Sequence, residues 1–130
     1  MNSEWASDKT KMKKSVLVVD DEKDLCEVMS RALKKEGFEV DCAYSLAEAG
    51  EKLAARPDIV IMDDNLPDGS GLDYIRMHPV VFMQSFVIMI SADPGMSLQT
   101  KAGVEGIRGF LPKPFSIDLM KRVLKPAQIE

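Results

Sequence analysis

Short apolar runs alternate along the chain with segments whose apolar residues recur at helical spacing. Residues 107–111 predict one further strand, and three runs, within residues 15–20, 59–63 and 86–90, are apolar at successive positions. Such runs predict strands that are buried on both faces, as in the centre of a parallel sheet. A fifth run, residues 38–42, alternates between apolar and polar side chains. It predicts a half-buried strand near an edge of the sheet.

Helices are expected between and after these strands, over residues 23–36, 46–56, 71–77, 94–104 and 116–125. Gly37 follows the first helix at the position of a C-terminal cap. Ser45 and Glu48 form a capping-box pattern at the start of the second helix. Ser116 caps the last helix, and Pro126 is expected to end it. The alternation of strands and helices predicts an α/β fold with a parallel sheet, helices on both faces and right-handed crossovers.

Polar side chains capable of chemistry stand where the predicted strands end. Asp20 and Asp21 follow the first strand, Asp63 ends the third, Ser91 follows the fourth, and Lys113 lies just past the fifth. Parallel strands present their carboxyl ends at one edge of the sheet, which is where open α/β sheets bind ligands. We therefore expect these five side chains to share one pocket.

The residue types in this pocket suit a magnesium ion and a phosphoryl group. Clustered carboxylates bind Mg²⁺, which commonly uses one or two of them together with phosphate and water. Two carboxylates ~4.5 Å apart repel each other by roughly 3–4 kcal/mol at an effective dielectric of 20, so three acids need a cation. The hydroxyl and the ammonium group suit phosphoryl oxygens. One aspartate could then act as the nucleophile that accepts the phosphoryl group.

Composition places limits on the alternatives. The 130 residues fit one domain, and the formal net charge of −4 argues against direct binding of nucleic acid. Residues 1–14 carry four lysines and two acids and are expected to form a disordered tail. No apolar run approaches the ~20 residues of a membrane span, and the N-terminus lacks a signal peptide, so we expect a cytoplasmic protein that does not enter the membrane. Cys26 and Cys42 have no metal or redox spacing and are interpreted as small buried apolar residues.

Four motifs occur in order along the chain. They are Val-Val-Asp20-Asp21-Glu, the segment from Asp63 through Asn-Leu-Pro to Gly71, Ile-Ser91-Ala, and Phe110-Leu-Pro-Lys113-Pro-Phe. Together they resemble the receiver domain of two-component response regulators over about residues 15–124. The resemblance implies a flavodoxin-like (βα)5 three-layer sandwich whose five-stranded sheet has the order 2-1-3-4-5. It also implies a receiver domain over residues 15–125, between the tail at 1–14 and a tail or linker at 126–130.

The resemblance further implies the role of each site residue. Asp63 would be the phosphoacceptor, taking its phosphoryl group from a sensor histidine kinase or a phosphotransfer protein. Lys113 would contact the phosphoryl group, while Ser91 and Phe110 would act as the switch pair. Relatives use the face formed by the fourth helix, fifth strand and fifth helix for output and for homodimer contacts. The magnesium ligands would be the carboxylates of Asp20, Asp21 and Asp63 and the backbone carbonyl of Asn65.

Three other classes of protein fit the sequence less well than a receiver domain. An aspartate-nucleophile phosphohydrolase would also use a strand-end aspartate and magnesium, but Asp20-Asp21 lacks the D-x-D spacing and the chain is short for a cap. A flavin-binding protein would need a Ser/Thr/Gly loop after the first strand. A pseudo-receiver, which only binds other proteins, is disfavoured by the intact set of acids, serine and lysine. We therefore expect a signalling domain rather than an enzyme.

Overall fold

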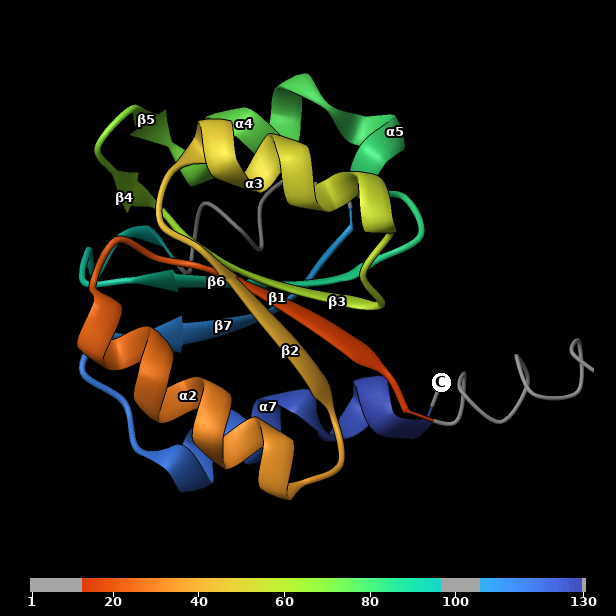
Figure 1. Ribbon diagram of the computed structural model, residues 1–130. Helices are drawn as coiled ribbons and strands as arrows, with labels where there is room; N and C mark the ends of the chain where they lie inside the picture. Colours follow the sequence, from red (N-terminus) through yellow and green to blue (C-terminus); the bar gives the residue numbers. More distant parts are fainter. Residues whose placement is uncertain (1–12, 97–105, 130) are drawn as a thin grey trace, which may run out of the picture.

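The computed structural model describes residues 13–96 and 106–129 of the chain. Their centre is a parallel five-stranded sheet in the order β2-β1-β3-β6-β7, which corresponds to the predicted order 2-1-3-4-5 (Figure 1). The flavodoxin-like fold class predicted from the sequence is thus confirmed. The strands are β1 (Ser15–Val19), β2 (Glu39–Ala43), β3 (Ile59–Asp63), β6 (Phe86–Ser91) and β7 (Ile107–Pro112).

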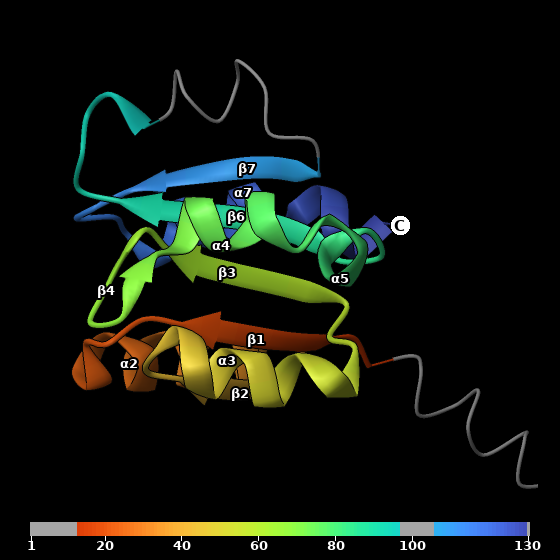
Figure 2. The same cartoon turned by 90° about the horizontal axis from the view of Figure 1, so that it is seen from above.

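Helices cover both faces of this sheet. Figures 1 and 2 show α2 and α7 on one face and α3, α4 and α5 on the other. The described helices are α2 (Lys23–Lys35), α3 (Leu46–Lys52), α4 (Gly71–Met77), α5 (Pro79–Phe82) and α7 (Ile117–Ile129), with a 3₁₀ turn at Leu53–Ala55 after α3. None of the helices in the described ranges is both long enough and apolar enough to span a bilayer.

The core lies in two layers, one on each side of the sheet. In β1, Val16 and Val18 pack toward α2 and α7, whereas Leu17 and Val19 pack toward α3 and α4. Every residue of β3 and β6 is buried. This explains why these strands read as unbroken apolar runs, because both of their faces are covered. The edge strand β2 has an alternating burial pattern, as its alternating sequence predicts.

Strand register brings the carboxyl ends of the strands level with one another. Met62 pairs with Val19, and Asp63 pairs with Ile90, the residue before Ser91. Ser91 in turn pairs with Pro112. The residues that end or follow β1, β3, β6 and β7 consequently lie along one edge of the sheet.

Two helix boundaries differ from the sequence prediction. Pro126 does not end the last helix, because α7 continues to Ile129 with Pro126 inside it. Ala127 is 1% exposed in the core, and Lys14 Nζ donates a 2.6 Å hydrogen bond to its carbonyl, so tertiary contacts offset the helix-breaking effect of proline. The segment after α4 also turns helical again, since Pro79 begins α5 at a position where its missing N–H costs little.

One further segment differs from the sequence prediction, and two predicted segments lie mostly outside the described residues. Residues expected to form only a turn after β3 contain a small antiparallel hairpin of β4 (Asn65–Leu66) and β5 (Gly69–Ser70). The helix predicted over residues 94–104 lies mostly outside the described residues. The same holds for the predicted tail at residues 1–14, of which residues 13 and 14 are described.

Candidate functional site

Asp63 ends β3 and is 3% exposed. It belongs to a cluster with Asp20, Asp21 and Lys113, which we call the acidic pocket. The chain after Asp63 turns back closely, because a Cβ at Gly71 would stand 2.2 Å from the carbonyl oxygen of Asp63. Asp64 holds this turn by accepting hydrogen bonds from Ser70 Oγ at 2.8 Å and from the Leu72 N–H at 3.2 Å. The phosphoacceptor candidate is therefore carried by a buried strand and a tightly fixed loop.

Asp20 faces Asp63 from the end of β1 and is fully buried. Its Oδ1 accepts a 2.9 Å hydrogen bond from the N–H of Glu22. Its Oδ2 accepts no well-oriented hydrogen bond from the described residues, although Lys113 Nζ lies 2.9 Å away as an ion-pair partner. A buried carboxylate oxygen that lacks a well-oriented hydrogen bond is a suitable ligand for a hard cation.

The three predicted acids meet at this edge. One carboxylate oxygen from each of Asp20, Asp21 and Asp63 lies within 4.8 Å of the others, and Asp21 is exposed to solvent. Oxygen donors at this separation fit a magnesium or calcium ion, with the exposed side left for water. The Asn65 side chain is also exposed, and its backbone N–H lies 3.5 Å from Asp63 Oδ1 in a long hydrogen bond.

Lys113 supplies the positive charge of the pocket. Its Nζ lies 2.6 Å from Glu22 Oε2, 2.9 Å from Asp20 Oδ2 and 3.3 Å from Asp63 Oδ2. Burial lowers the pKa of Lys113, but the contacts with Glu22 and Asp20 outweigh this effect and raise the pKa above its usual value. The ammonium group consequently remains charged. The Lys113–Pro114 peptide bond is cis, and the Lys113 N–H donates to the Ser91 carbonyl at 2.9 Å.

The electrostatics of the pocket are unbalanced without a metal ion. Burial, followed by the charge on Asp20, raises the pKa of Asp63 to about 6, although Lys113 opposes the change. One partly buried lysine therefore does not fully compensate the neighbouring acids. A divalent cation among these oxygens would favour the ionised form of Asp63.

The predicted switch residues lie on the paired strands β6 and β7. Ser91 is 5% exposed, and its Oγ accepts a 2.9 Å hydrogen bond from the Asp93 N–H. Phe110 lies in β7 and is partly buried against the core layer that contains Met89. The hydroxyl proton of Ser91 is not used by the Asp93 contact, so it can be donated to a group in the pocket.

The family model of the response regulator receiver domain matches residues 16–125. The chain belongs to this family. Receiver domains are signalling domains of two-component systems, which typically interact with histidine kinases or phosphotransfer proteins. The recognition made from the four sequence motifs is confirmed.

Solved receiver domains resemble this one over most of their length. The non-phosphorylated HemR receiver domain from Leptospira biflexa is 27% identical with a TM-score of 0.77, and the match covers 89% of this chain and 94% of that chain. The chemotaxis response regulator CheY4 of Vibrio cholerae is 25% identical with a TM-score of 0.79, over 88% and 98% of the two chains. A receiver domain protein from Clostridium thermocellum is 25% identical with a TM-score of 0.78, over 89% and 94%.

Sequence reasoning missed one residue of this receiver's pocket. Glu22 follows the two candidate metal ligands and makes the shortest contact of Lys113, at 2.6 Å, while its own side chain is 59% exposed. Its position directly after Asp20 and Asp21 is the sequence feature that could have identified Glu22 as a residue of the pocket. Nothing in the local sequence, however, indicates that Lys113, 91 positions away, would be its partner.

Proposed function

We propose that this receiver domain works in the cytoplasm and that Asp63 accepts a phosphoryl group from a sensor histidine kinase or a phosphotransfer protein. The observation that carries the proposal is the placing of the Asp63 carboxylate. It is buried at the end of a strand, within 4.8 Å of the two other acids and 3.3 Å from the ammonium group of Lys113. A carboxylate oxygen of Asp63 would attack phosphorus, and the bond from phosphorus to the donor's histidine nitrogen would break.

The acidic cluster is the proposed magnesium site. Asp20, Asp21 and Asp63 would supply carboxylate oxygens, and Asn65 would supply its backbone carbonyl. When bound, Mg²⁺ supplies positive charge that offsets the acids and the phosphoryl oxygens. Two observations support this proposal: Asp20 Oδ2 accepts no well-oriented hydrogen bond from the described residues, and the pKa of Asp63 is raised.

Lys113 is proposed to transfer one of its contacts to the phosphoryl group. Its pair with Glu22 is the contact that costs least to break, since the Glu22 side chain is 59% exposed and can be solvated by water. Its contacts with the buried Asp20 and Asp63 are more expensive to lose. Glu22 thus keeps the ammonium group in place before phosphorylation and releases it afterwards.

Ser91 and Phe110 are proposed to relay the phosphorylated state to the protein surface. The Ser91 hydroxyl would donate a charge-assisted hydrogen bond to a phosphoryl oxygen, and Phe110 would fill the space that Ser91 leaves. Both residues lie next to the face that includes β7 and α7. We propose this face as the surface that contacts an output partner or a second copy of the chain.

The proposal is tested by incubating the protein with acetyl phosphate and Mg²⁺ and measuring its intact mass. The wild type should gain one phosphoryl group, and Asp63→Asn should gain none. Asp64→Asn is the matched control, because an asparagine oxygen can still accept the hydrogen bonds from Ser70 and Leu72. Undiminished labelling of Asp63→Asn would refute the assignment of the acceptor.

The same experiment distinguishes the other classes weighed above. A pseudo-receiver would show no labelling under any condition, and a phosphohydrolase would turn over phosphomonoesters repeatedly. For the metal site, Asp21→Ala should fold normally but lose phosphorylation, because Asp21 is exposed and contributes a ligand charge rather than packing. A wild-type phosphorylation rate that is unchanged by chelation would exclude the metal role.

The switch is tested with Ser91→Ala. This variant should still be phosphorylated at Asp63, because Ser91 Oγ contacts only the Asp93 N–H among the described residues. Amide NMR shifts measured with a phosphoryl analogue should change across β7 and α7 in the wild type and far less in the variant. Equal shift changes in the two proteins would refute the coupling.

A further inference from the structure

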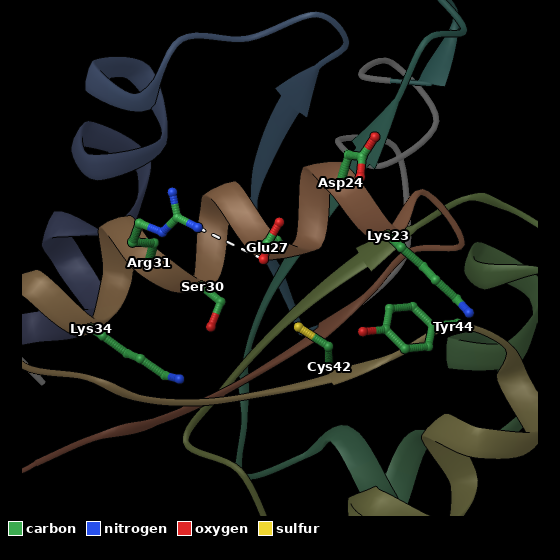
Figure 3. Close-up of a pocket in the computed structure, with 8 residues that line it drawn as sticks. All are labelled: Lys23, Asp24, Glu27, Ser30, Arg31, Lys34, Cys42 and Tyr44. Atoms are coloured by element: carbon green, nitrogen blue, oxygen red, sulfur yellow. Dashed lines mark ion pairs between the residues drawn. The ribbon is translucent and has the colours of Figure 1, made fainter.

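The two cysteines, whose spacing in the sequence predicts no pairing, meet between α2 and β2. Cys26 lies on the buried face of α2 and is 0% exposed, whereas Cys42 on β2 is partly exposed. The Cys42 thiol lies 3.9 Å from the carbonyl oxygen of Cys26. Figure 3 shows the sulfur of Cys42 pointing from β2 toward α2. A buried thiol and an accessible thiol thus stand next to each other, and both are reduced.

Cys42 also opens onto the surface. It lines a cavity of about 510 Å³ between α2 and the end of β2, which is large enough for a small molecule rather than a single water. Cations outnumber acids by three to two among the lining residues, which are Lys23, Asp24, Glu27, Ser30, Arg31, Lys34, Cys42 and Tyr44 (Figure 3).

The surroundings of Cys42 favour its thiolate. The adjacent Cys26 side chain lowers the pKa of Cys42, with smaller contributions from Lys52 and Lys34, and together they outweigh burial and the charge on Asp41. Lys52 is held there by a 2.6 Å hydrogen bond from its Nζ to the Cys42 carbonyl. Since thiolates are the reactive form of cysteine, Cys42 is the thiol of the pair that an oxidant would meet first.

Cys26 connects this pair to the acidic pocket. Its Sγ donates a 3.2 Å hydrogen bond to the backbone carbonyl of Asp20. Asp20 is held on its other side by its own N–H, which donates to the Ala43 carbonyl at 3.0 Å, one residue after Cys42. The backbone that positions Asp20 is therefore in contact with both cysteine-bearing elements.

We propose that Cys42 and Cys26 form a reversible disulfide, in which Cys42 reacts first with a carboxylate-bearing low-molecular-weight disulfide that enters the cavity. The Cys42 thiolate attacks one sulfur of this disulfide, a mixed disulfide forms and the other half leaves as a thiolate. Cys26 then attacks the Cys42 sulfur, the second half leaves, and the Cys26 proton passes to that leaving thiolate. The two cysteines are oxidised, and the small disulfide is reduced to two thiols.

Oxidation changes the acidic pocket because a disulfide sulfur carries no proton. Cys26 can then no longer donate to the Asp20 carbonyl, and α2 must adjust to the new bond. We expect the oxidised protein to bind Mg²⁺ several-fold more weakly than the reduced protein. This consequence rests on the proposed function of the pocket, whereas the thiol chemistry does not. Cytosolic disulfides are commonly transient and redox-sensing, which suits a reversible role.

The thiol chemistry is tested with glutathione disulfide as the probe and intact mass as the readout. The wild type should end with two hydrogens fewer and no glutathione attached. Cys26→Ser should stop at one attached glutathione, because the resolving thiol is missing. Cys42→Ser should not react, since Cys26 is buried. Reaction of Cys42→Ser at the wild-type rate, or a glutathione adduct that persists on the wild type, would overturn the proposal.

Coupling to the pocket is tested by titrating Mg²⁺ into the oxidised and the reduced wild type. The amide resonance of Glu22 is the probe, because its N–H donates to Asp20 Oδ1. The expected result is a several-fold weaker affinity after oxidation that returns on reduction. Equal affinities would overturn the coupling, while failure of the phosphoacceptor proposal would instead show as a lack of labelling at Asp63 in the reduced protein. Cys26→Ala, with circular dichroism as a folding check, replaces Cys26→Ser if serine prevents folding.

Discussion

Replacing Asp63 with asparagine should make the metal-free protein more stable at neutral pH. Asp63 is 3% exposed, and burial followed by the charge on Asp20 raises its pKa from 3.8 to about 6. The folded protein therefore holds a proton on Asp63 more tightly than the unfolded chain does. Ionising Asp63 costs folding free energy, and asparagine removes this cost while keeping the shape of the side chain.

The magnitude follows from the two pKa values. They differ by about two units, and at 1.36 kcal/mol per unit the ionised carboxylate costs about 3 kcal/mol of stability at pH 7. The attraction of Lys113 is already included in this figure, because it is one of the contributions to the pKa of Asp63. Below pH 3.8 the group is protonated in both states, so its favourable contribution is fully present. It is lost as the pH rises through about 6, and the advantage of the variant should grow over the same interval.

The assay is urea unfolding of both proteins between pH 4 and pH 8 in the presence of a chelator. The free energy of unfolding of Asp63→Asn should exceed that of the wild type by about 3 kcal/mol at pH 7 and by well under 1 kcal/mol at pH 4. Glu51→Gln is the control, since it changes the net charge equally on the exposed side of α3. A difference that does not vary with pH would refute the electrostatic explanation, and so would an equal gain in Glu51→Gln.

Three further outcomes are expected. Gly71→Ala should lower the free energy of unfolding by about 2 kcal/mol or more, measured by urea unfolding, because the new Cβ would stand 2.2 Å from the carbonyl oxygen of Asp63. Asp68→Ala should also lower it in the same assay, because Asp68 accepts hydrogen bonds from the first N–H groups of α3, those of Leu46 and Ala47. Adding Mg²⁺ should raise the thermal midpoint of the wild type in scanning calorimetry and leave that of Asp63→Asn nearly unchanged.

The sheet and most of the candidate site could be predicted because the deciding information is local. Strands β1, β3 and β6 are buried on both faces and so read as apolar runs, and Asp20, Asp63 and Ser91 stand at or directly after their ends. The parallel topology then predicts that these residues meet, because it brings the carboxyl ends of the strands to one edge whatever the details of packing. Asp20, Asp63 and Lys113 are widely separated in sequence and yet meet as expected.

The features that escaped prediction depend on contacts between elements that are distant in sequence. Pro126 stays helical because Ala127 is buried and its carbonyl accepts a hydrogen bond from Lys14 near the other end of the chain. The pairing of Lys113 with Glu22 depends on the conformation of the loop after β7. Cys26 and Cys42 are neighbours because α2 and β2 pack into the same core layer. No periodicity or spacing rule reports which residues of two elements meet in this way.

The acidic pocket lowers the free energy of unfolding of the domain instead of stabilising it. A fully buried Asp20 oxygen without a well-oriented hydrogen bond and an Asp63 with a raised pKa both cost free energy. The rest of the domain tolerates this cost because β1 and β3 are fixed by packing on both faces, so the acids cannot move apart. Sites that break local rules at the expense of stability are characteristic of function. A cation that enters the pocket relieves the repulsion between the carboxylates. Binding of the cation therefore raises the free energy of unfolding, and Asp63 links ligand binding to folding stability.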